Sequence, residues 1–503
     1  MITAEDLKNF FERRKLRMII AADAEPRVHQ RKNGNIVSII PAGGVSIALD
    51  PIAQISQGLF IARGKTGTDK EVVDRDDKVK IQGDLGSYTL KRIFVDEEEE
   101  QDYYNGFSNQ TLWPLCHVAF QPPIFESSWY ESYTKVNQRF AKAIGEASLR
   151  QNSFIWVHDY QLALVPKYLD KPKDAVLGMF WHIPWPTWEA FRILPQKREI
   201  LESMLSCDFL AFHRGYHVRN FLDTVKREFE VRIDEETNKV YYNKRVITVK
   251  NLPMGIDSDV IKAVAQQSQG SSFFGVIAKA LVDTDSQKKM KDSFEEFFKK
   301  YKVIIGIDRL DYTKGLTLRL GAIEKFLKKY PQYVGKVVYV GIIAPSRETI
   351  PAYKAVRREI RKQAFEINLK YARKEWAPIH LIYQVFTRKD VMNFYKKAQL
   401  CLVTPLDDGM NLVSKEFVIA ASNVENPGML VLSQFAGSAI DLTSALIINP
   451  YNVEEVAIAI KDGLEMKRAE KLRRMKSMAE ALEDKNIYAW TEDFVRAAVD
   501  AAR

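Results

Sequence analysis

The sequence contains few cysteines and no long hydrophobic run, and each absence narrows what the protein can be. Its three cysteines, Cys116, Cys207 and Cys401, are far apart, and each lies within an apolar stretch. This pattern is typical of reduced core residues rather than of a disulfide framework, so we expect a reducing compartment. Nowhere do about 18 uncharged apolar residues run together, and we therefore predict no membrane-spanning helix and no membrane partner.

An export signal and internal repeats are also lacking. The first residues form a charged, amphipathic segment up to Arg17, without the apolar stretch of a signal peptide. The one biased segment, Glu97–Glu100, is typical of an exposed turn or a helix start. These features predict a cytoplasmic protein.

Clustered basic runs of the kind that bind nucleic acid are absent as well. Although 74 Lys and Arg residues against 65 Asp and Glu give a net charge of +9, the longest basic stretch, residues 467–476, includes Glu470. Such a stretch is typical of the solvated face of a helix. We predict no nucleic-acid partner and interpret the charge as a field that attracts anionic small molecules.

What the sequence does contain is an alternation of short apolar, β-branched runs with longer helical patterns. With 503 residues and a hydrophobic share of 46%, the chain is long enough for two or three domains. The alternation predicts parallel strands joined by crossover helices. We expect strands at residues 18–22, 154–157, 176–181, 209–212, 303–307, 337–343, 380–385, 400–403, 429–432 and 445–448, and helices at 134–149, 192–205, 318–328, 347–370, 453–484 and 487–502.

Each half is therefore predicted to be an open, doubly wound α/β sheet. A boundary is expected where a strand ends in proline and glycine near residues 250–257, before a polar, Ser-rich stretch. We predict one Rossmann-like domain at residues 1–252, on which a C-terminal helix at 485–503 packs back, and a second at residues 253–484. Ligands bind beyond the carboxyl ends of the strands in such sheets, so we expect a site in the cleft between the domains.

Two basic side chains follow one predicted strand of the second half. The run Asp308-Arg-Leu-Asp-Tyr-Thr-Lys-Gly315 places Arg309 and Lys314 at a strand-to-helix turn, where unpaired backbone N–H groups add a partial positive charge. Two fixed cations at such a turn form a clamp for a pyrophosphate. A surface salt-bridge cluster with Asp308 and Asp311 explains the same residues equally well.

An acidic, glycine-containing turn follows another predicted strand. In Pro405-Leu-Asp-Asp-Gly-Met-Asn-Leu-Val-Ser-Lys-Glu416, Asp408 lies at the turn and Glu416 one to two turns into a helix. Carboxylates accept charge-assisted hydrogen bonds from sugar hydroxyls. Asp407 or Asp408 as an ordinary helix N-cap accounts for one acid and not for the whole segment, which favours a sugar site.

In the first half, two predicted strands end in histidine. His158 is followed by Asp159, and His182 by two prolines that fix the direction of its backbone carbonyl. One histidine in such a place is more often structural than catalytic, but two at carboxyl ends favour function. The segment at residues 103–114 mixes aromatic and amide side chains, which suits either sugar binding or a buried aromatic loop, and composition favours the loop.

These segments together resemble the trehalose-6-phosphate synthase family of retaining glycosyltransferases, which have the GT-B fold. The resemblance covers nearly the whole chain, from about residue 18 to about residue 460. It rests on Ala42-Gly-Gly44, Tyr104 with Phe107-Ser-Asn109, Leu112-Trp-Pro114, Val157-His-Asp-Tyr160, His182-Ile-Pro-Trp-Pro186, Asp308-Arg-Leu-Asp-Tyr-Thr-Lys-Gly315, Ala344-Pro-Ser-Arg347, Asp408-Gly-Met-Asn-Leu-Val413 with Glu416, and Ser433-Gln-Phe-Ala-Gly437.

The resemblance implies a donor site in the second domain, which would bind the nucleotide sugar. Arg309 and Lys314 are then expected to hold the donor diphosphate and to stabilise the charge on the leaving group. Asp408 and the backbone after it would hold the donor glucose, and Glu416 the ribose. The implied donor-binding residues are Gly43, Gly44, Arg309, Lys314, Asp408, Gly409, Met410, Asn411, Leu412, Val413 and Glu416.

The resemblance also implies that the first domain binds the acceptor. His182 is expected to turn its backbone carbonyl toward the anomeric carbon, and Asp159 to hydrogen-bond the acceptor sugar. Tyr104, Trp113 and Arg347 are the implied acceptor-binding residues, with Arg347 on the phosphate. The implied catalytic residues are Arg309, Lys314, His182 and Asp159.

The implied reaction is a front-face attack in which the departing β-phosphate oxygen takes the proton of the acceptor. It involves no metal, no cofactor and no protein nucleophile. The isolated Asp283-Thr-Asp285 resembles a metal-binding pattern but is a weak indication in a polar, variable stretch. The implied partners are a nucleotide sugar, UDP- or GDP-glucose, and a sugar phosphate, with a separate phosphatase downstream, and the sequence is compatible with a homo-oligomer.

The sequence departs from the family after the first strand. Ala22-Asp-Ala24 stands where the family usually has Ser-Asn-Arg, so a positive charge expected at the acceptor phosphate is missing. Arg27 and Arg31 are the candidates to replace it. Trp185 also replaces a usual phenylalanine and is expected to reshape the same pocket.

Three functions therefore remain open. They are a trehalose-6-phosphate synthase, a glucosylglycerol-phosphate synthase or another transferase with a phosphorylated acceptor, and a non-catalytic homologue that binds sugar phosphates. The presence of Arg309, Lys314, Asp408 and Glu416 favours an enzyme.

Overall fold

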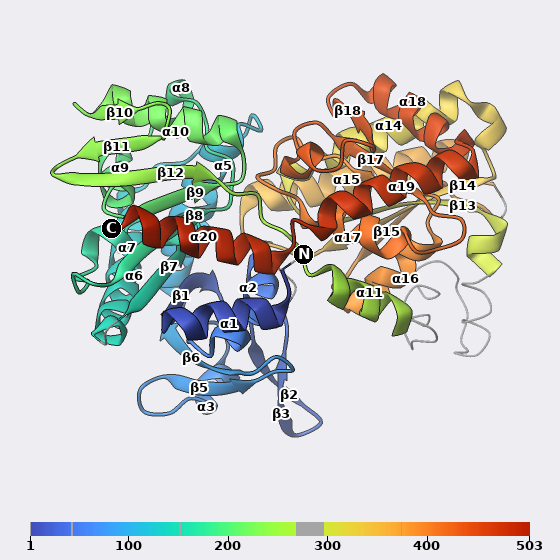
Figure 1. Cartoon of the computed structure of the whole chain (residues 1–503). Coiled ribbons are helices and arrows are strands. Elements are labelled where there is room, and N and C mark those ends of the chain that lie inside the picture. Colours follow the sequence, from blue (N-terminus) through green and yellow to red (C-terminus); the bar gives the residue numbers. More distant parts are fainter. Residues whose placement is uncertain (1, 42–43, 150–151, 268–295, 374) are drawn as a thin grey trace. The chain divides into compact units, whose positions relative to one another are not determined.

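The computed structural model of the chain describes residues 2–41, 44–149, 152–267, 296–373 and 375–503 (Figure 1). The chain divides into two units. Unit 1 comprises Met1–Gly255 and Lys485–Arg503, and unit 2 comprises Ile256–Asp484. The chain therefore passes between the units twice, after Gly255 and after Asp484. The boundary expected between residues 252 and 253 stands just before the first passage.

Unit 1 is built on a sheet in the order β10-β11-β12-β9-β8-β7-β1-β4-β6-β5. The strands from β12 to β6 in this order are parallel, and β11, β10 and β5 extend the two edges in antiparallel pairs. The winding begins at β1 and reverses between β1 and β7, and such a reversal is where open α/β sheets bind ligands. The strands are β1 (Arg17–Ala24), β4 (Leu59–Gly64), β5 (Lys78–Gln82), β6 (Ser87–Phe94), β7 (Ser153–His158), β8 (Val176–Trp181), β9 (Phe209–Phe212), β10 (Arg232–Asp234), β11 (Lys239–Tyr242) and β12 (Arg245–Asn251), with a separate hairpin of β2 (Val28–Lys32) and β3 (Asn35–Ile39).

Some helices of unit 1 begin at residues whose side chains cap them. Thr3 and Asp6 form a capping box at the start of α1, and Asp96 and Glu99 form another at the start of α4. The helices are α1 (Ala4–Arg14), α2 (Gly44–Ser56), α3 (Gly67–Glu71), α4 (Glu97–Glu100), α5 (Trp113–His117), α6 (Ser127–Ser148), α7 (Val165–Tyr168), α8 (Trp188–Phe191), α9 (Lys197–Met204), α10 (Gly215–Glu228) and α20 (Ile487–Ala501), with a 3₁₀ turn η2 (Tyr160–Leu162).

The aromatic segment after α4 is a helix, and the prediction of a loop was wrong. Residues Gln101–Leu112 form a π-helix, η1. The amide side chains of Asn109 and Gln110 donate to the carbonyl oxygens of Tyr104 and Asn105, five residues back, at 2.7 and 3.1 Å. The amides thus support the wider turn, which functional sites often contain.

The C-terminal helix α20 packs on the sheet of unit 1. The ring of Phe494 lies 4.6 Å from that of Trp156 and 5.0 Å from that of Phe209. Gly178 leaves room for this ring, because a Cβ there would lie 2.7 Å from it. Trp490 also donates from Nε1 to the carbonyl oxygen of Leu252 at 3.2 Å.

Unit 2 is built on a parallel sheet in the order β15-β14-β13-β16-β17-β18. Its winding begins at β13 and reverses between β13 and β16, which is the strand order of dinucleotide-binding sheets. The central strands are buried on both faces, so they appear in the sequence as continuous apolar runs. The strands are β13 (Lys302–Arg309), β14 (Val337–Ala344), β15 (Ile379–Tyr383), β16 (Leu400–Val403), β17 (Met429–Ser433) and β18 (Leu446–Ile448).

The helices of unit 2 lie between these strands. They are α11 (Ser258–Gln267), α14 (Leu316–Lys329), α15 (Pro351–Tyr371), α16 (Arg388–Lys397), α17 (Leu412–Ala421), α18 (Val453–Glu465) and α19 (Arg468–Glu483), with the 3₁₀ turns η3 (Tyr312–Lys314), η4 (Pro331–Tyr333) and η5 (Gly437–Ile440).

Several expected helices have other bounds in the structure; α6 begins seven residues before the expected start at residue 134, and α15 begins four residues after the expected start at residue 347. The helix expected at residues 453–484 is two helices, because Met466 and Lys467 have extended ψ angles of 131° and 143° between α18 and α19. The helix expected from residue 192 begins only at Lys197. Neither Met466 nor Lys467 is a glycine or proline, so no residue type marked the break.

Disulfides and membrane-spanning helices were both predicted to be absent, and the structure addresses each only for the residues that it describes. Cys116, Cys207 and Cys401 are buried and form no disulfide in the described chain. No helix in the described part has the combined length and hydrophobicity needed to cross a bilayer.

Candidate active site

The basic and acidic residues predicted for the site in unit 2 lie in segments that follow two neighbouring strands. β13 pairs with β16 in parallel register, and the winding of the sheet reverses between them. The segment containing Arg309 and Lys314 follows β13, and the segment containing Asp408 follows β16. Both segments therefore start from the same edge of the sheet, where ligands bind in folds of this kind.

The turn after β13 is shaped by local hydrogen bonds. The Asp311 carboxylate accepts from the backbone N–H of Thr313 at 3.0 Å. Gly315 then takes a φ of 64°, and a Cβ on it would lie 2.4 Å from the carbonyl oxygen of Thr404. Only glycine suits both the angle and the space, and α14 begins directly after it, at Leu316.

Lys314 and Asp408 meet in the folded unit. The Lys314 Nζ lies 2.6 Å from Oδ2 of Asp408, and the side-chain amide of Asn411 donates to the same oxygen at 3.1 Å. The Lys314 and Asp408 side chains are 10% and 17% exposed, so the charges face each other with little solvent between them. Arg309 is exposed at the carboxyl end of β13.

The salt-bridge alternative for this segment described a surface cluster, and the two acids are buried. Asp308 pairs with Arg319 at 2.6 Å, and Asp311 lies 3.6 Å from Arg347. Burial raises the pKa of Asp308 despite the charge of Arg319. Burial acts in the same direction on Asp311, but the charges of Arg347, Arg309 and Lys314 hold the pKa of Asp311 below its ordinary value.

The loop after β16 is held by its neighbour after β17. The N–H of Gly437 donates to the carbonyl oxygen of Asp408 at 2.9 Å, and that of Ser438 to the oxygen of Met410 at 2.6 Å. A Cβ on Gly437 would lie 1.9 Å from the carbonyl oxygen of Gly409, so no side chain fits there. The approach of the two loops fixes the backbone on which Asp408 stands.

Asn411, and not an aspartate, caps α17. Its φ is 82°, and its side chain accepts from the N–H of Ser414 at 3.0 Å. The hypothesis that Asp407 or Asp408 is the N-cap is therefore wrong. Leu412 and Val413 form the first turn of α17, whose N–H groups carry the positive end of the helix dipole.

Glu416 lies farther along α17 and contacts Arg388. Its Oε1 is 3.1 Å from Nη2 of Arg388, and its side chain is 23% exposed. Burial raises the pKa of this carboxyl although the Arg388 charge opposes it.

The histidines of unit 1 form a buried, uncharged pair. Nδ1 of His158 lies 2.9 Å from Nε2 of His182. Burial lowers the pKa of His182 to about 3, and burial with the adjacent imidazole holds the pKa of His158 well below its ordinary value. Both rings are therefore neutral at neutral pH, and Nδ1 of His182 is buried with no hydrogen-bond partner among the described atoms.

Asp159 connects the ends of β7 and β8. It takes a φ of 71°, its N–H donates to the carbonyl oxygen of Phe180 at 2.8 Å, and its carboxylate accepts from the N–H of His182 at 3.1 Å. Asp159 thus fixes the backbone at His182. Trp185 is buried against Phe191, so its ring fills the core of unit 1.

The aromatic residues of the predicted acceptor site lie along η1 and α5. Tyr104 is half-buried, and the centre of the Trp113 ring lies 3.9 Å from that of the His117 ring, with the two planes tilted by 33°. Asn109 donates to the carbonyl oxygen of Tyr104 and accepts from the Tyr160 hydroxyl at 2.8 Å. Arg347 belongs to unit 2, where it donates to the Tyr353 hydroxyl at 2.5 Å.

The sequence interpretation missed Arg63. This residue ends the apolar run of β4, and its guanidinium contacts Asp23 at the end of β1 at 2.9 Å. The run Leu59-Phe-Ile-Ala-Arg63 was the available signal, because a charged residue closes a short apolar strand. The two expected substitutes are engaged elsewhere, Arg27 with Asp50 and Arg31 with Glu71.

Some of the expected site residues lie outside the part of the chain that the structure describes. Gly43 and the pair Asp283 and Asp285 lie outside it, whereas Gly44 is described and begins α2. Within the described residues no three His, Cys, Asp or Glu side chains gather closely enough to hold a metal ion.

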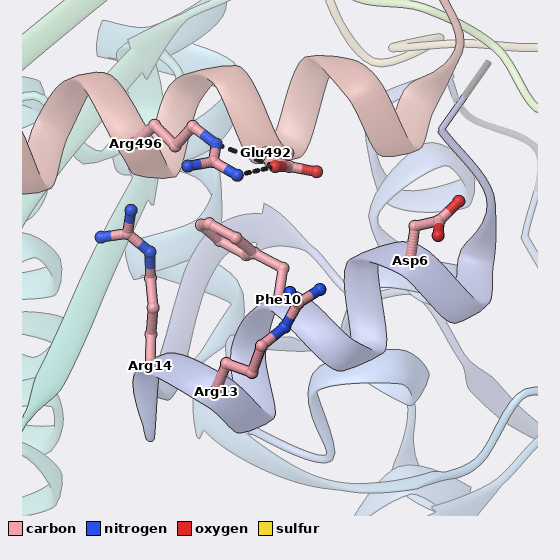
Figure 2. Close-up of a pocket in the computed structure, with 6 residues that line it drawn as sticks. All are labelled: Asp6, Phe10, Arg13, Arg14, Glu492 and Arg496. Atoms are coloured by element: carbon pink, nitrogen blue, oxygen red, sulfur yellow. Dashed lines mark hydrogen bonds and ion pairs between the residues drawn. The ribbon is translucent and has the colours of Figure 1, made fainter.

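A cavity of about 380 Å³ lies in unit 1 away from these residues (Figure 2). Phe10 of α1 lies between the guanidinium groups of Arg14 and Arg496, which are 5.0 and 4.9 Å from its ring centre. The cavity is lined by Asp6, Phe10, Arg13, Arg14, Glu492 and Arg496. These contacts join α1 to α20, and none of the predicted site residues lines the cavity.

The comparison with known families agrees with this geometry. The sequence profile of glycosyltransferase family 20 matches residues 16–500. The chain belongs to glycosyltransferase family 20. The predicted resemblance to trehalose-6-phosphate synthases is thereby confirmed.

Relatives of this family 20 chain carry consistent names. The UDP-forming α,α-trehalose-phosphate synthase A of Dictyostelium discoideum is 33% identical over 95% of this chain and 62% of its own length. A bifunctional trehalose-6-phosphate synthase/phosphatase of Thermoproteus tenax is 34% identical over 91% of this chain and 58% of its own. The chain thus spans about three fifths of these two relatives. The UDP-forming synthase of Candida albicans is 33% identical over 92% of this chain and 93% of its own.

Solved structures share the fold of this family 20 chain. An E. coli trehalose-6-phosphate protein bound with UDP-2-fluoro glucose is 31% identical, with a TM-score of 0.81 over 96% of this chain and 99% of its own. A UDP-forming synthase from Burkholderia xenovorans in complex with glucose-6-phosphate is 29% identical, with the same TM-score over 96% and 99% of the two chains. The predicted α/β fold of the GT-B class is confirmed by these likenesses.

Proposed function

We propose that the protein transfers a glucosyl unit from a nucleotide glucose to glucose 6-phosphate and forms α,α-trehalose 6-phosphate with retention. The observation that carries the proposal is the contact of Lys314 with Asp408 at the strand reversal of unit 2. A fixed cation beside a sugar-binding carboxylate is the arrangement that a nucleotide sugar requires. Membership of glycosyltransferase family 20 and the names of the relatives support it.

In this proposal unit 2 binds the donor. Arg309 and Lys314 hold the diphosphate, and their charges stabilise the negative charge that grows on the leaving group. Asp408 holds the glucose hydroxyls, the N–H groups at the start of α17 contribute partial positive charge, and Glu416 binds the ribose. The loop contacts after β17 support this assignment, since they hold the Asp408 backbone in place before the donor binds.

Unit 1 in turn binds the acceptor and directs the transferred sugar. The carbonyl of His182 faces the electron-poor anomeric carbon, and Asp159 keeps that backbone in position. Because His158 engages Nε2 of His182, Nδ1 is the nitrogen that contacts a glucose hydroxyl. Tyr104, Trp113 and the unit 2 residue Arg347 bind the phosphorylated acceptor.

The glycosidic bond to the nucleoside diphosphate breaks as the acceptor oxygen attacks the same face of the sugar. The β-phosphate oxygen takes the acceptor proton, so the products are the new glycoside and the protonated nucleoside diphosphate. The neutral His158 and His182 pair is consistent with a step in which no side chain takes that proton. We further propose a cytoplasmic setting and a separate phosphatase that removes the phosphate.

A second acceptor is favoured by one observation. Ala24 leaves the end of β1 without the arginine usual in the family, so a smaller phosphate ester such as glycerol 3-phosphate is the alternative acceptor. Five nucleotide glucoses crossed with glucose 6-phosphate and glycerol 3-phosphate separate the two. We expect nucleoside diphosphate to be released only when glucose 6-phosphate is present. If it is released with glycerol 3-phosphate and not with glucose 6-phosphate, glycerol 3-phosphate is the acceptor.

The same assay tests the diphosphate clamp. Arg309→Ala should lower kcat/KM by about a hundredfold or more, because a preorganised charge at the leaving group is lost. Lys302→Ala is the matched control, since Lys302 is an exposed cation at the other end of β13. Activity of Arg309→Ala within tenfold of the wild type, with an intact fold, would contradict the clamp.

A further inference from the structure

Arg63 stands beside the position where a cation is missing. In the pairing of β1 with β4, Arg63 is the direct partner of Ala24, although the register shifts between Ala21 and Ala24. The guanidinium therefore starts from the neighbouring strand at the same level of the sheet. It lies at the carboxyl edge of unit 1, next to the reversal of strand order between β1 and β7.

The Arg63 guanidinium is fixed by Asp23. Its Nε and Nη2 donate to the two carboxylate oxygens at 2.9 and 3.2 Å, and the Tyr103 hydroxyl donates to the same carboxylate at 2.9 Å. Burial is the largest single effect and raises the pKa of Asp23, but the charge and hydrogen bonds of Arg63, together with Lys65 and the Tyr103 hydroxyl, make the net shift downward. The Arg63 and Asp23 side chains are almost fully buried, so this ion pair is charged and held in one orientation.

Arg63 also touches the acceptor side of the site. The centre of its guanidinium lies 4.6 Å from the ring centre of Tyr104, a residue assigned to the acceptor. When a planar guanidinium packs against an aromatic face, the N–H groups at its edge stay available to hydrogen-bond an anion.

The outer edge of Arg63 carries a carboxylate that can be displaced. Nη1 lies 2.5 Å from Oε1 of Glu100, whose side chain is 41% exposed, compared with 4% for Asp23. Glu100 ends the short, acidic helix α4, and its partly exposed carboxylate returns to solvent at a lower cost than the buried carboxylate of Asp23 would. Lys65, exposed just beyond β4, adds a second positive charge that lowers the pKa of Asp23.

We propose that Arg63 recognises the phosphate of the acceptor in unit 1, and that Glu100 occupies its outer edge until the phosphate displaces it. This inference rests on the proposed function and specifies the acceptor class as a phosphate monoester. Without Glu100, the charges of Arg63, Lys65 and Asp23 sum to +1, which suits a phosphate. With Glu100 in place, the four charges sum to zero. An uncharged sugar would not compensate the Arg63 charge and therefore would not displace Glu100.

Calorimetric titration of the wild-type protein with glucose 6-phosphate, without donor, tests the inference independently of turnover. Glu100→Gln should tighten binding by about threefold, because the competing carboxylate is an exposed partner. Glu98→Gln is the matched control, since Glu98 is exposed on the same helix and the variant makes the same change in net charge. Equal effects of the two variants, or none, would overturn the proposal.

Arg63→Lys keeps the charge but loses the planar fork. We expect it to weaken glucose 6-phosphate binding by about tenfold or more, with an unchanged donor KM and an unchanged kcat at saturating acceptor. Unchanged affinity would overturn the role of Arg63. If the wild type binds glucose 6-phosphate as described but releases no nucleoside diphosphate with any donor, the proposed function fails and the phosphate site stands.

Discussion

Glu25 is a buried carboxyl of unit 1 whose ionisation opposes folding. It is fully buried, its Oε2 accepts from Nε of Arg92 at 2.8 Å, and its Oε1 has no hydrogen-bond partner among the described atoms. Arg92 also contacts Asp69 at 2.9 Å, so its charge is shared between two acids. Burial raises the pKa of Glu25 to about 7 despite the charge of Arg92.

This residue predicts a pH dependence of stability. Between the ordinary pKa of 4.5 and about 7, the folded protein keeps a proton on Glu25 that the unfolded chain has lost. The free energy of unfolding from this group therefore falls as pH rises through that window, by up to about 3 kcal/mol. Glu25→Gln should show a smaller decrease in Tm between about pH 5 and about pH 8 than the wild type. Glu98→Gln should keep the wild-type decrease, and equal decreases in all three proteins would contradict the assignment.

Residues also show where the site was predictable. Lys314 and Asp408 were expected in one site because each follows an apolar strand, and parallel strands end at one edge. Arg63 was not expected, because its role depends on the pairing of β4 with β1 rather than on its neighbours in the chain. Sequence separation likewise hid the contacts that engage Arg27 and Arg31.

At the scale of elements, one residue connects the stability of α17 to the proposed donor site. Asn411 caps the helix, takes a φ of 82°, and donates to Asp408 at 3.1 Å. The oxygen of its amide therefore accepts from the helix backbone, and the nitrogen donates to the Asp408 carboxylate, which we propose binds the sugar. Few side chains do both, since a positive φ disfavours most residues other than glycine and asparagine.

Two substitutions of Asn411 separate these roles. Asn411→Ala should lower the free energy of unfolding by about 1–2 kcal/mol, whereas Asn411→Gly should lower it less because glycine accepts the positive φ. Both should raise the donor KM to a similar extent, since both lose the bond to Asp408. Asn452→Ala, which removes the cap of α18, is the control and should lower Tm without changing the donor KM. A normal donor KM in both Asn411 variants would contradict the link.

Most of the predicted strands are buried on both faces, although β4 is equally buried and was not predicted. The central strands β7, β8, β13 and β16 are buried on both faces and appear as apolar runs, whereas the edge strands β5 and β10 have exposed residues and were not predicted. The break between α18 and α19 and the π-helix η1 also lacked a signal in residue type.

At the scale of the whole molecule, the last helix belongs to the unit formed by the first residues. α20 follows unit 2 in the chain, yet Phe494 packs among Trp156, Phe180 and Phe209 of unit 1. The polypeptide therefore completes the core of unit 1 only when its last residues are present.

Replacing this ring should weaken unit 1. Phe494→Ala should lower its free energy of unfolding by about 3–5 kcal/mol, because a large buried aromatic ring is lost and a cavity remains. Tryptophan fluorescence during denaturant unfolding reports on unit 1, since Trp376 is the one tryptophan of unit 2. The fluorescence midpoint should fall in Phe494→Ala and stay unchanged in Asp500→Ala, a change at an exposed residue of α20. A wild-type midpoint in the first variant would contradict the packing role.

The amino-acid sequence alone determined the fold class, the family and the strand ends at which the candidate site lies. Strands that are buried on both faces appear in the sequence as apolar runs, and the turns after them require particular residues. Tertiary structure alone decided which charges meet. Lys314 reaches Asp408, Arg63 reaches Asp23 and Glu100, and His158 reaches His182 across strands far apart in the chain. The physical reason is that an ion pair depends on distance in space, which residue order along the chain does not encode.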